Sequence, residues 1–258
     1  MKTTPPLLQR LAVFGYGLLA YAATLAIFAY AFCFIGNLWV PRSIDATPTA
    51  PLRVALLVDA ALLVLFSVQH SLMARPVFKR WLTRLVPAAA ERSTYLFFSC
   101  LALVALFAFW QPMGGIVWQA ENETVRMLLY TGYVFGWLLV LAVTFLINHF
   151  DLFGLRQIWL YLRGRAYTQL RFVTPGPYRL IRHPLYAGWF CVFWFTPTMS
   201  LAHLVFAVLT TGYILIAIQF EERDLEDAHP EYLAYKRRTP MLVPRLGGQS
   251  DEIVPVND

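Results

Sequence analysis

Residues 174–222 read TPGPYRLIRHPLYAGWFCVFWFTPTMSLAHLVFAVLTTGYILIAIQFEE. The apolar segment 185–220 within this stretch is too long for a single membrane crossing of ~20 residues, and Pro197 interrupts it. A helical hairpin that breaks at Pro197 explains both features. The hairpin would bring the glutamate pair 221–222 back to the Arg-His-Pro turn at 182–184, so the stretch predicts one polar site at a membrane surface.

The composition is that of an integral membrane protein. Of the 258 residues, 59% are hydrophobic and only 14% are charged, and the mean hydropathy is +0.55. No polar stretch is long enough for a separate soluble domain, which needs ~50 residues or more. The net charge of +6 is therefore interpreted as membrane topology rather than as nucleic-acid binding.

Four further apolar runs precede the hairpin and predict membrane spans. They lie at about 11–35, 52–74, 94–110 and 127–147. The sequence therefore predicts an all-α, polytopic helical bundle of five to six spans. We expect a bundle over 1–147 and a second region over 148–258 that carries the hairpin and the tail.

The basic residues predict the orientation of this bundle. If the hairpin crosses and returns, 18 of the 21 Lys and Arg residues, Lys2 among them, lie on one face, and Arg42, Arg53 and Arg126 lie on the other. Lys and Arg collect on the cytoplasmic side of membrane proteins. Both termini and the segment 148–183 are therefore expected in the cytoplasm.

A polar cluster follows the fourth span. His149, Asp151, Arg156 and Gln157 stand just past its end. Such residues are common at membrane interfaces, where they carry no chemistry. They are equally consistent with a pocket in which His149 and Asp151 take part in proton transfer.

The turn at 182–184 has the features of an anion site. Pro184 suits the first position of a helix, whose free backbone N–H groups favour a carboxylate, and Arg182 and His183 stand beside them. The carboxylates of Glu221 and Glu222 would meet a cationic amine next to that site. A ligand with an amino-acid moiety would satisfy both ends.

Polar residues inside the second span have two interpretations. Asp59 is costly in a membrane unless it is paired, and its position near the outer face favours a structural or pocket-bottom role. Gln69 and His70, near the cytoplasmic end, line a substrate pocket or sit at the interface. The three cysteines lie in apolar runs without metal-ligand spacing, so no metal site is expected.

Three common motifs are absent from the sequence. It contains no Gly-x-Gly-x-x-Gly fingerprint, no Gly-Lys-Ser/Thr loop and no His-Glu-x-x-His pattern. A Rossmann-type cofactor domain, a P-loop ATPase and a zinc protease are therefore not expected. Any nucleotide cofactor must be held by the membrane bundle itself.

One motif resembles that of a known enzyme family. The pattern Gly176-x-Tyr178-x-x-Ile181-Arg182-His183-Pro184-x-Tyr186-x-Gly188, followed by Glu221-Glu222, resembles the isoprenylcysteine carboxyl methyltransferase-like superfamily. The resemblance implies that residues 148–258 form a methyltransferase core that holds S-adenosylmethionine at the cytoplasmic membrane face. The residues implied as cofactor-binding are Tyr178, Arg182, His183, Pro184, Leu185, Tyr186, Gly188, Glu221 and Glu222.

The first half of the chain is similar to the NnrU-like branch of this superfamily. The stretches that carry the likeness are QHSLMARP at 69–76, ERSTY at 91–95, HFDLFGLRQ at 149–157 and PMLVP at 240–244. The likeness implies an enzyme of the bacterial inner membrane that methylates a small volatile thiol, with methanethiol as the first choice.

A small thiol is mostly protonated at neutral pH, so a base or a positive field is required. We expect His149 with Asp151 to be the base, Arg156 to lower the thiol pKa, and Gln69, His70 and Gln157 to line the substrate pocket. Other acceptors stay open: an isoprenylcysteine carboxylate, a phospholipid amine or a different thiol. A non-catalytic accessory membrane protein of the NnrU-like kind is also consistent with the sequence.

Overall fold

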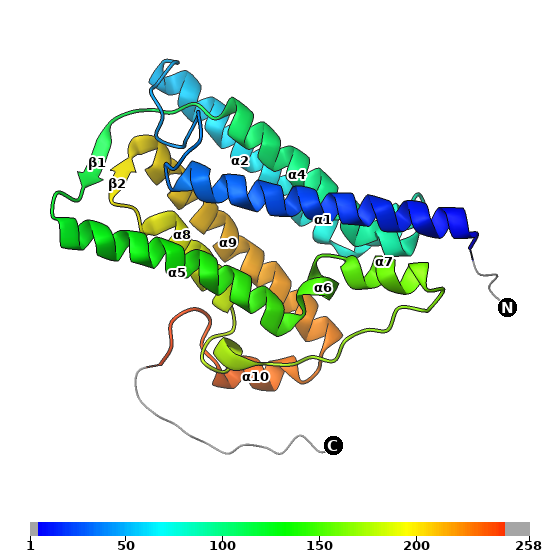
Figure 1. Cartoon of the computed structure of the whole chain (residues 1–258). Coiled ribbons are helices and arrows are strands. Elements are labelled where there is room, and N and C mark those ends of the chain that lie inside the picture. Colours follow the sequence, from blue (N-terminus) through cyan, green and yellow to red (C-terminus); the bar gives the residue numbers. More distant parts are fainter. Residues whose placement is uncertain (1–4, 246–258) are drawn as a thin grey trace.

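The structure is a computed structural model, and it describes residues 5–245. Lys2 and the outermost residues of the predicted regions 1–147 and 148–258 lie outside the described part of the chain. The described residues form a helical bundle with one two-stranded antiparallel sheet (Figure 1). The all-α polytopic fold predicted from the sequence is confirmed.

Five helical segments within residues 5–245 are long and apolar enough to cross a membrane. They are α1 (Leu7–Ile35), α2 (Leu52–Ala74), the segment Ala88–Phe109 that ends in α4 (Glu91–Phe109), α5 (Glu123–Ile147) and α9 (Leu201–Ala228). Three of them, α1, α4 and α5, begin three or four residues earlier than predicted, and Glu91 and Glu123 occupy the first turns of α4 and α5. Acidic side chains are stabilised there by the helix dipole.

The predicted hairpin consists of two arms of unequal length. Its first arm, α8 (Pro184–Trp194), has only 11 residues and is about 16 Å long, too short to cross a bilayer as a helix. The chain then passes Pro197 and becomes extended in β2 (Thr198–Ser200) before α9 begins.

The strand β2 has a partner that the sequence did not predict. It pairs antiparallel with β1 (Ile116–Gln119), which lies between the predicted spans 94–110 and 127–147. The pairing gives the extended backbone of the hairpin the hydrogen bonds that a helix would otherwise supply.

Glycines allow α8 to pack closely on α5. A Cβ atom at Gly188 would lie 3.0 Å from the Gly136 carbonyl oxygen, and one at Gly136 would lie 2.8 Å from the Gly188 carbonyl oxygen. Small residues at such contacts let helix backbones approach each other in membranes. Gly188, predicted as a cofactor residue, therefore faces α5.

Short helices collect at one end of the bundle. They are α3 (Pro76–Leu82), α6 (His149–Leu152), α7 (Leu155–Leu162), the 3-10 turn η2 (Gly176–Arg179) and α10 (Tyr232–Arg238). Figure 1 shows α7 and α10 at the end of the bundle opposite to β1 and β2. The polar clusters identified in the sequence lie on these short helices and on the ends of the long ones.

Candidate active site

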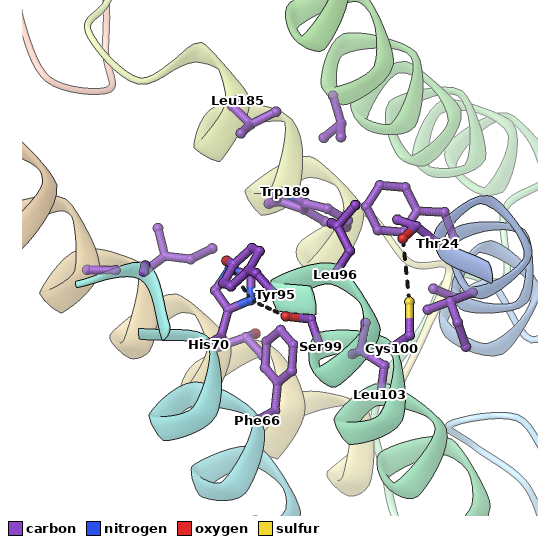
Figure 2. Close-up of a pocket in the computed structure, with 18 of the residues that line it drawn as sticks. Thr24, Phe66, His70, Tyr95, Leu96, Ser99, Cys100, Leu103, Leu185 and Trp189 are labelled. Carbon is purple, nitrogen blue, oxygen red and sulfur yellow. Dashed lines mark hydrogen bonds between the residues drawn. The ribbon is translucent and has the colours of Figure 1, made fainter. Parts of the chain in front are cut away.

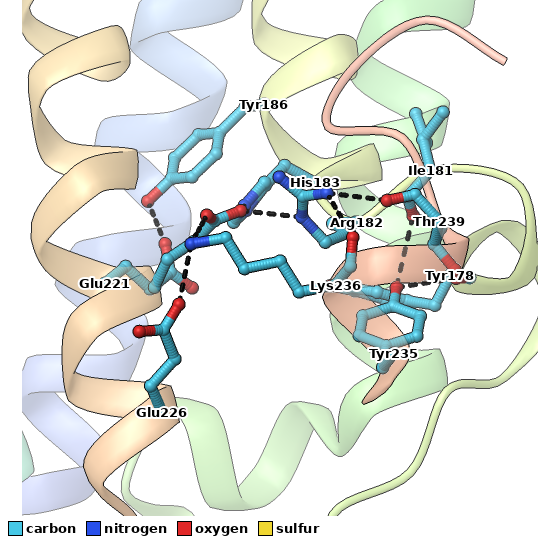
Figure 3. Close-up of polar contacts among 11 residues, drawn as sticks. Tyr178, Ile181, Arg182, His183, Tyr186, Glu221, Glu226, Tyr235, Lys236 and Thr239 are labelled. Atoms are coloured by element: carbon cyan, nitrogen blue, oxygen red, sulfur yellow. Dashed lines mark hydrogen bonds and ion pairs between the residues drawn. The ribbon is translucent and has the colours of Figure 1, made fainter. Parts of the chain in front are cut away.

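The Arg-His-Pro turn meets the glutamate pair of α9, as the sequence predicted. Arg182 Nε donates to Glu222 Oε1 at 2.7 Å, and His183 Nε2 lies 2.9 Å from the same oxygen. All three side chains are largely buried. Figure 3 shows the contacts that tie the start of α8 to α9.

Lys236 of α10 completes this ion cluster. Its Nζ lies 2.9 Å from Glu222 Oε2 and 2.6 Å from Glu226 Oε1. Hydrogen bonds to Glu226 and Glu222 raise the pKa of Lys236 above its ordinary value. Glu222 therefore has two cationic neighbours, Arg182 and Lys236, and a hydrogen bond to His183, so its charge is already balanced by the protein.

The tail fixes the position of the turn. The backbone N–H groups of Arg182 and His183 donate to the carbonyl oxygens of Pro240 and Met241 at 2.9 and 3.1 Å. The Arg182 guanidinium also donates to the Thr239 carbonyl oxygen at 2.6 Å. These hydrogen bonds hold the turn against the stretch 239–241. The segment 240–244 is one of those that carry the family resemblance.

Tyr235 holds the segment before the turn in a similar way. Its hydroxyl donates to the Tyr178 carbonyl oxygen at 2.6 Å. Burial raises the pKa of Tyr235 to about 12, so the hydroxyl stays protonated and available as a donor. Tyr178 therefore lies in the cluster, next to Tyr235 and to the turn.

Glu221 is in a different situation from Glu222. The Tyr186 hydroxyl donates to Glu221 Oε2 at 2.7 Å (Figure 3), and this is the only side-chain hydrogen bond to Glu221 within residues 5–245. Glu221 forms no ion pair in that range and is partly exposed. Its carboxylate thus keeps one oxygen for a ligand, and no cationic side chain within residues 5–245 pairs with it.

An elongated cavity of about 380 Å³ begins beside this cluster. Tyr186 and Leu185 line it, so the hydroxyl that contacts Glu221 belongs to a side chain in the cavity wall. Charged residues lie at the mouth, namely Lys79, Glu91 and Arg92. The rest of the wall is mostly apolar and comes from α1, α2, α4, α5, α6, α8 and α9 and from Phe153.

His70 is the imidazole in the wall of this cavity. Its Nε2 lies 2.7 Å from the Tyr95 hydroxyl, and its Nδ1 lies 3.3 Å from Ser99 Oγ. Figure 2 shows His70 on α2 facing Tyr95 and Ser99 on α4, beside Phe66. The sequence predicted His70 as a pocket residue, whereas Tyr95 and Ser99 were not singled out.

The other two predicted pocket residues have different surroundings. Gln69 donates to Met73 Sδ at 3.1 Å, and Gln157 donates to the Asp151 carbonyl oxygen at 3.1 Å. Within the described part of the chain, neither side chain is in the cavity wall. The Gln69 amide instead bonds one turn along α2, and the Gln157 amide links α7 to α6.

His149 is held at both ring nitrogens. Thr144 Oγ1 donates to the Leu141 carbonyl oxygen at 2.7 Å, so it accepts from His149 Nδ1 at 2.8 Å. The Tyr21 hydroxyl lies 2.8 Å from Nε2. Because Nδ1 carries the proton, the Nε2 lone pair accepts from this hydroxyl and the imidazole is neutral. Burial lowers the pKa of His149, in agreement with a neutral ring. Its role as the base stays a prediction.

Asp151 and Arg156 form a separate ion pair. Arg156 Nη1 lies 2.9 Å from Asp151 Oδ1, and the same guanidinium donates to the Thr168 carbonyl oxygen at 2.9 Å. The Tyr167 hydroxyl donates to Asp151 Oδ2 at 3.2 Å, and burial raises the pKa of Tyr167. The pair therefore ties the loop after α7 to α6. The predicted catalytic roles of the two residues remain untested by these contacts.

The structure makes the interpretation of Asp59 more definite. Asp59 is fully buried and accepts from the Gln111 backbone N–H at 2.8 Å, so it caps the turn after α4; it is not in the cavity wall of the described chain. The ion pair between Glu222 and Lys236 was not predicted from the sequence. No local signal in the sequence indicates that pairing, because it depends on the fold of the tail.

Comparisons with known proteins give close relatives. The methanethiol S-methyltransferase of Crocosphaera subtropica is 51% identical over 94% of this chain and 96% of that protein. The methanethiol S-methyltransferase of Mycobacterium tuberculosis is 44% identical over 92% of this chain and 98% of that protein. Nurim of Sus scrofa is 32% identical over 65% of this chain and 66% of that protein. No protein-family model and no solved structure matches the chain.

Proposed function

The chain belongs to the methanethiol S-methyltransferase family, and on this premise we propose that it transfers a methyl group from S-adenosylmethionine to methanethiol, giving dimethyl sulfide. The observation that carries the proposal is the position of Tyr186. This side chain contacts the free carboxylate of Glu221 and also lines the apolar cavity. A charged site for the methyl donor and an apolar site for a small thiol thus share one wall.

The donor site fits an amino-acid moiety. The Glu221 carboxylate has capacity for an ammonium group, and the N–H groups of Leu185 and Tyr186 in the first turn of α8 suit a carboxylate. Bound there, S-adenosylmethionine would supply a methyl group already activated on a sulfonium. We assign the amine contact to Glu221, because Arg182 and Lys236 already neutralise Glu222.

The protein then has to place the thiol and accept its proton. Placement of two bound reactants alone can lower a barrier by ~7 to 11 kcal/mol in well-oriented cases. The apolar wall suits a small hydrophobic thiol, and the basic residues Lys79 and Arg92 at the mouth favour a thiolate.

Two imidazoles are candidates for the base. His149, with Asp151 and Arg156, is the assignment made from the sequence. His70 is the second candidate, because it lines the cavity in which we place the thiol. A His70→Gln variant and a His149→Gln variant separate them: the base is the residue whose replacement removes the acid limb of the pH–rate profile.

We further propose that the donor site faces the cytoplasm of a bacterial cell, with the bundle in the inner membrane. The basic residues of α7, α10 and the connecting loops support this orientation, because they share the end of the bundle that carries the Arg182–Glu222 cluster. S-adenosylmethionine is made inside cells, so the donor site has to open to that side.

The proposal is tested with purified protein in detergent. The protein is incubated with S-adenosylmethionine and methanethiol, and dimethyl sulfide is measured in the headspace beside a Glu221→Gln control. We expect product with the wild type and at least a tenfold lower rate with the variant at low donor concentration. Donor binding without dimethyl sulfide would refute the acceptor, and absence of donor binding would refute the donor site.

A further inference from the structure

The cavity is much longer than methanethiol requires. Glu91 and Phe107 both line the cavity and both belong to α4. They are 16 positions apart, which corresponds to about 24 Å of helix. Its volume is about 380 Å³. A molecule with two heavy atoms fills only a small part of that space, since a single water accounts for about 30 Å³ of liquid.

The deep part of the cavity is mostly apolar, and the hydroxyls of Thr24 and Thr210 that line it donate to backbone carbonyl oxygens of their own helices. Its wall beyond the His70 and Tyr95 level is formed by side chains of four helices, among them Ile35, Leu63, Leu103, Leu106, Phe107 and Phe206. Figure 2 shows Leu96, Cys100 and Leu103 following one another along α4 away from Tyr95. Such a wall offers no partner for the polar atoms of an adenosyl group, and it suits a hydrocarbon chain.

We propose that this protein also methylates longer unbranched alkyl thiols, with the sulfur near Tyr186 and the alkyl chain in the deep part of the cavity. This inference rests on the proposed function and widens its substrate class. The thiolate sulfur forms the new bond to the methyl carbon, and the bond from that carbon to the donor sulfonium breaks. The donor leaves as a neutral thioether, and the thiol proton passes to a base and then to water.

The length of the chain should affect the reaction in a graded way. Burying one methylene strengthens binding by about fourfold, so kcat/KM should rise about fourfold for each added carbon until the deep end is reached. A chain that exceeds the cavity should react more slowly, because its end would clash with the residues that close the deep end of the cavity.

The experiment compares methanethiol, n-propanethiol and n-pentanethiol with the wild type and with two variants. Leu103→Trp fills the cavity, whereas Leu101→Trp adds the same group two residues away on a side chain that is 48% exposed. We expect the ratio of kcat/KM for pentanethiol to that for methanethiol to fall at least tenfold in Leu103→Trp. This ratio should keep its wild-type value in Leu101→Trp. Thiols partition into detergent equally in both samples, so this partition cannot cause a difference between the two variants.

The outcomes separate this inference from the proposed function. Methylation of methanethiol with no methylation of propanethiol or pentanethiol by the wild type would overturn the inference and leave the proposed function intact. Equal ratios in the two Trp variants would also overturn it. Failure with every thiol, methanethiol included, would refute the proposed function itself. The wild-type series decides the matter even if Leu103→Trp does not fold.

Discussion

Adjacent glutamates in this chain have opposite environments, and their replacement should have opposite effects. Glu222 is 4% exposed and pairs with Arg182 and Lys236, so Glu222→Gln leaves the largely buried Arg182 guanidinium without its carboxylate partner. We expect it to lower the free energy of unfolding by about 3 kcal/mol, seen as a lower thermal midpoint in detergent. Glu221→Gln should leave the midpoint nearly unchanged and raise the KM for the methyl donor roughly tenfold or more. Equal losses of stability would refute the assignment.

His149 predicts a pH dependence of stability. Its pKa is lowered by burial, so in the window between its folded-state pKa and about 6.5 the unfolded chain binds more protons than the folded one. Stability therefore rises with pH through that window. The contribution is complete above about pH 6.5 and is lost as the pH falls through the folded-state pKa.

Thermal midpoints measured between pH 7.5 and 5 test this effect. His149→Gln keeps a donor for Thr144 and removes the titrating ring, so its midpoint should fall less steeply toward acid pH. Other titrating groups are common to both proteins. Parallel curves would show that His149 is not the group responsible.

At the level of elements, the packing of α8 on α5 depends on glycine. Gly188→Ala would place a methyl group 3.0 Å from backbone oxygen of α5, which cannot move aside, and we expect a loss of about 1 to 3 kcal/mol. Gly212→Ala on α9 is the matched control, because nothing lies within 4 Å of its added Cβ. That variant should be neutral or more stable by up to about 1 kcal/mol. If both lowered the thermal midpoint equally, close approach would not explain Gly188.

The sequence predicts these elements unevenly. Continuous apolar runs identify the long helices, and the break at Pro197 identifies the hairpin, because both are local properties. The pairing of β1 with β2 joins residues about 80 positions apart, and nothing in 111–126 indicates its partner. The same holds within the site: the meeting of 182–184 with 221–222 follows from the hairpin, whereas the bond from Lys236 to Glu222 depends on the tail.

At the scale of the whole molecule, the bundle separates charge from apolar volume. The ion cluster lies at the end that carries α10, and the cavity runs from that end into the bundle between the long helices. A charged methyl donor bound at the ion cluster and a volatile thiol bound in the apolar cavity would therefore meet beside Tyr186. The sequence predicted the charged end, because the residues within each of the motifs 182–184 and 221–222 are adjacent along the chain and the hairpin brings the two motifs together. It could not predict the cavity, whose wall is assembled from eight of the described helices.

This arrangement requires the α10 end to face the cytoplasm, which can be measured. In a background with Cys33, Cys100 and Cys191 replaced by Ala, single cysteines are introduced as Arg237→Cys on α10 and Glu121→Cys between β1 and α5. Both positions are exposed and lie toward opposite ends of the bundle. A membrane-impermeant maleimide should label Glu121→Cys in intact cells and Arg237→Cys only after permeabilisation. The reverse pattern would place the donor site outside the cell, where S-adenosylmethionine is not made, and would contradict the proposed reaction at its first step.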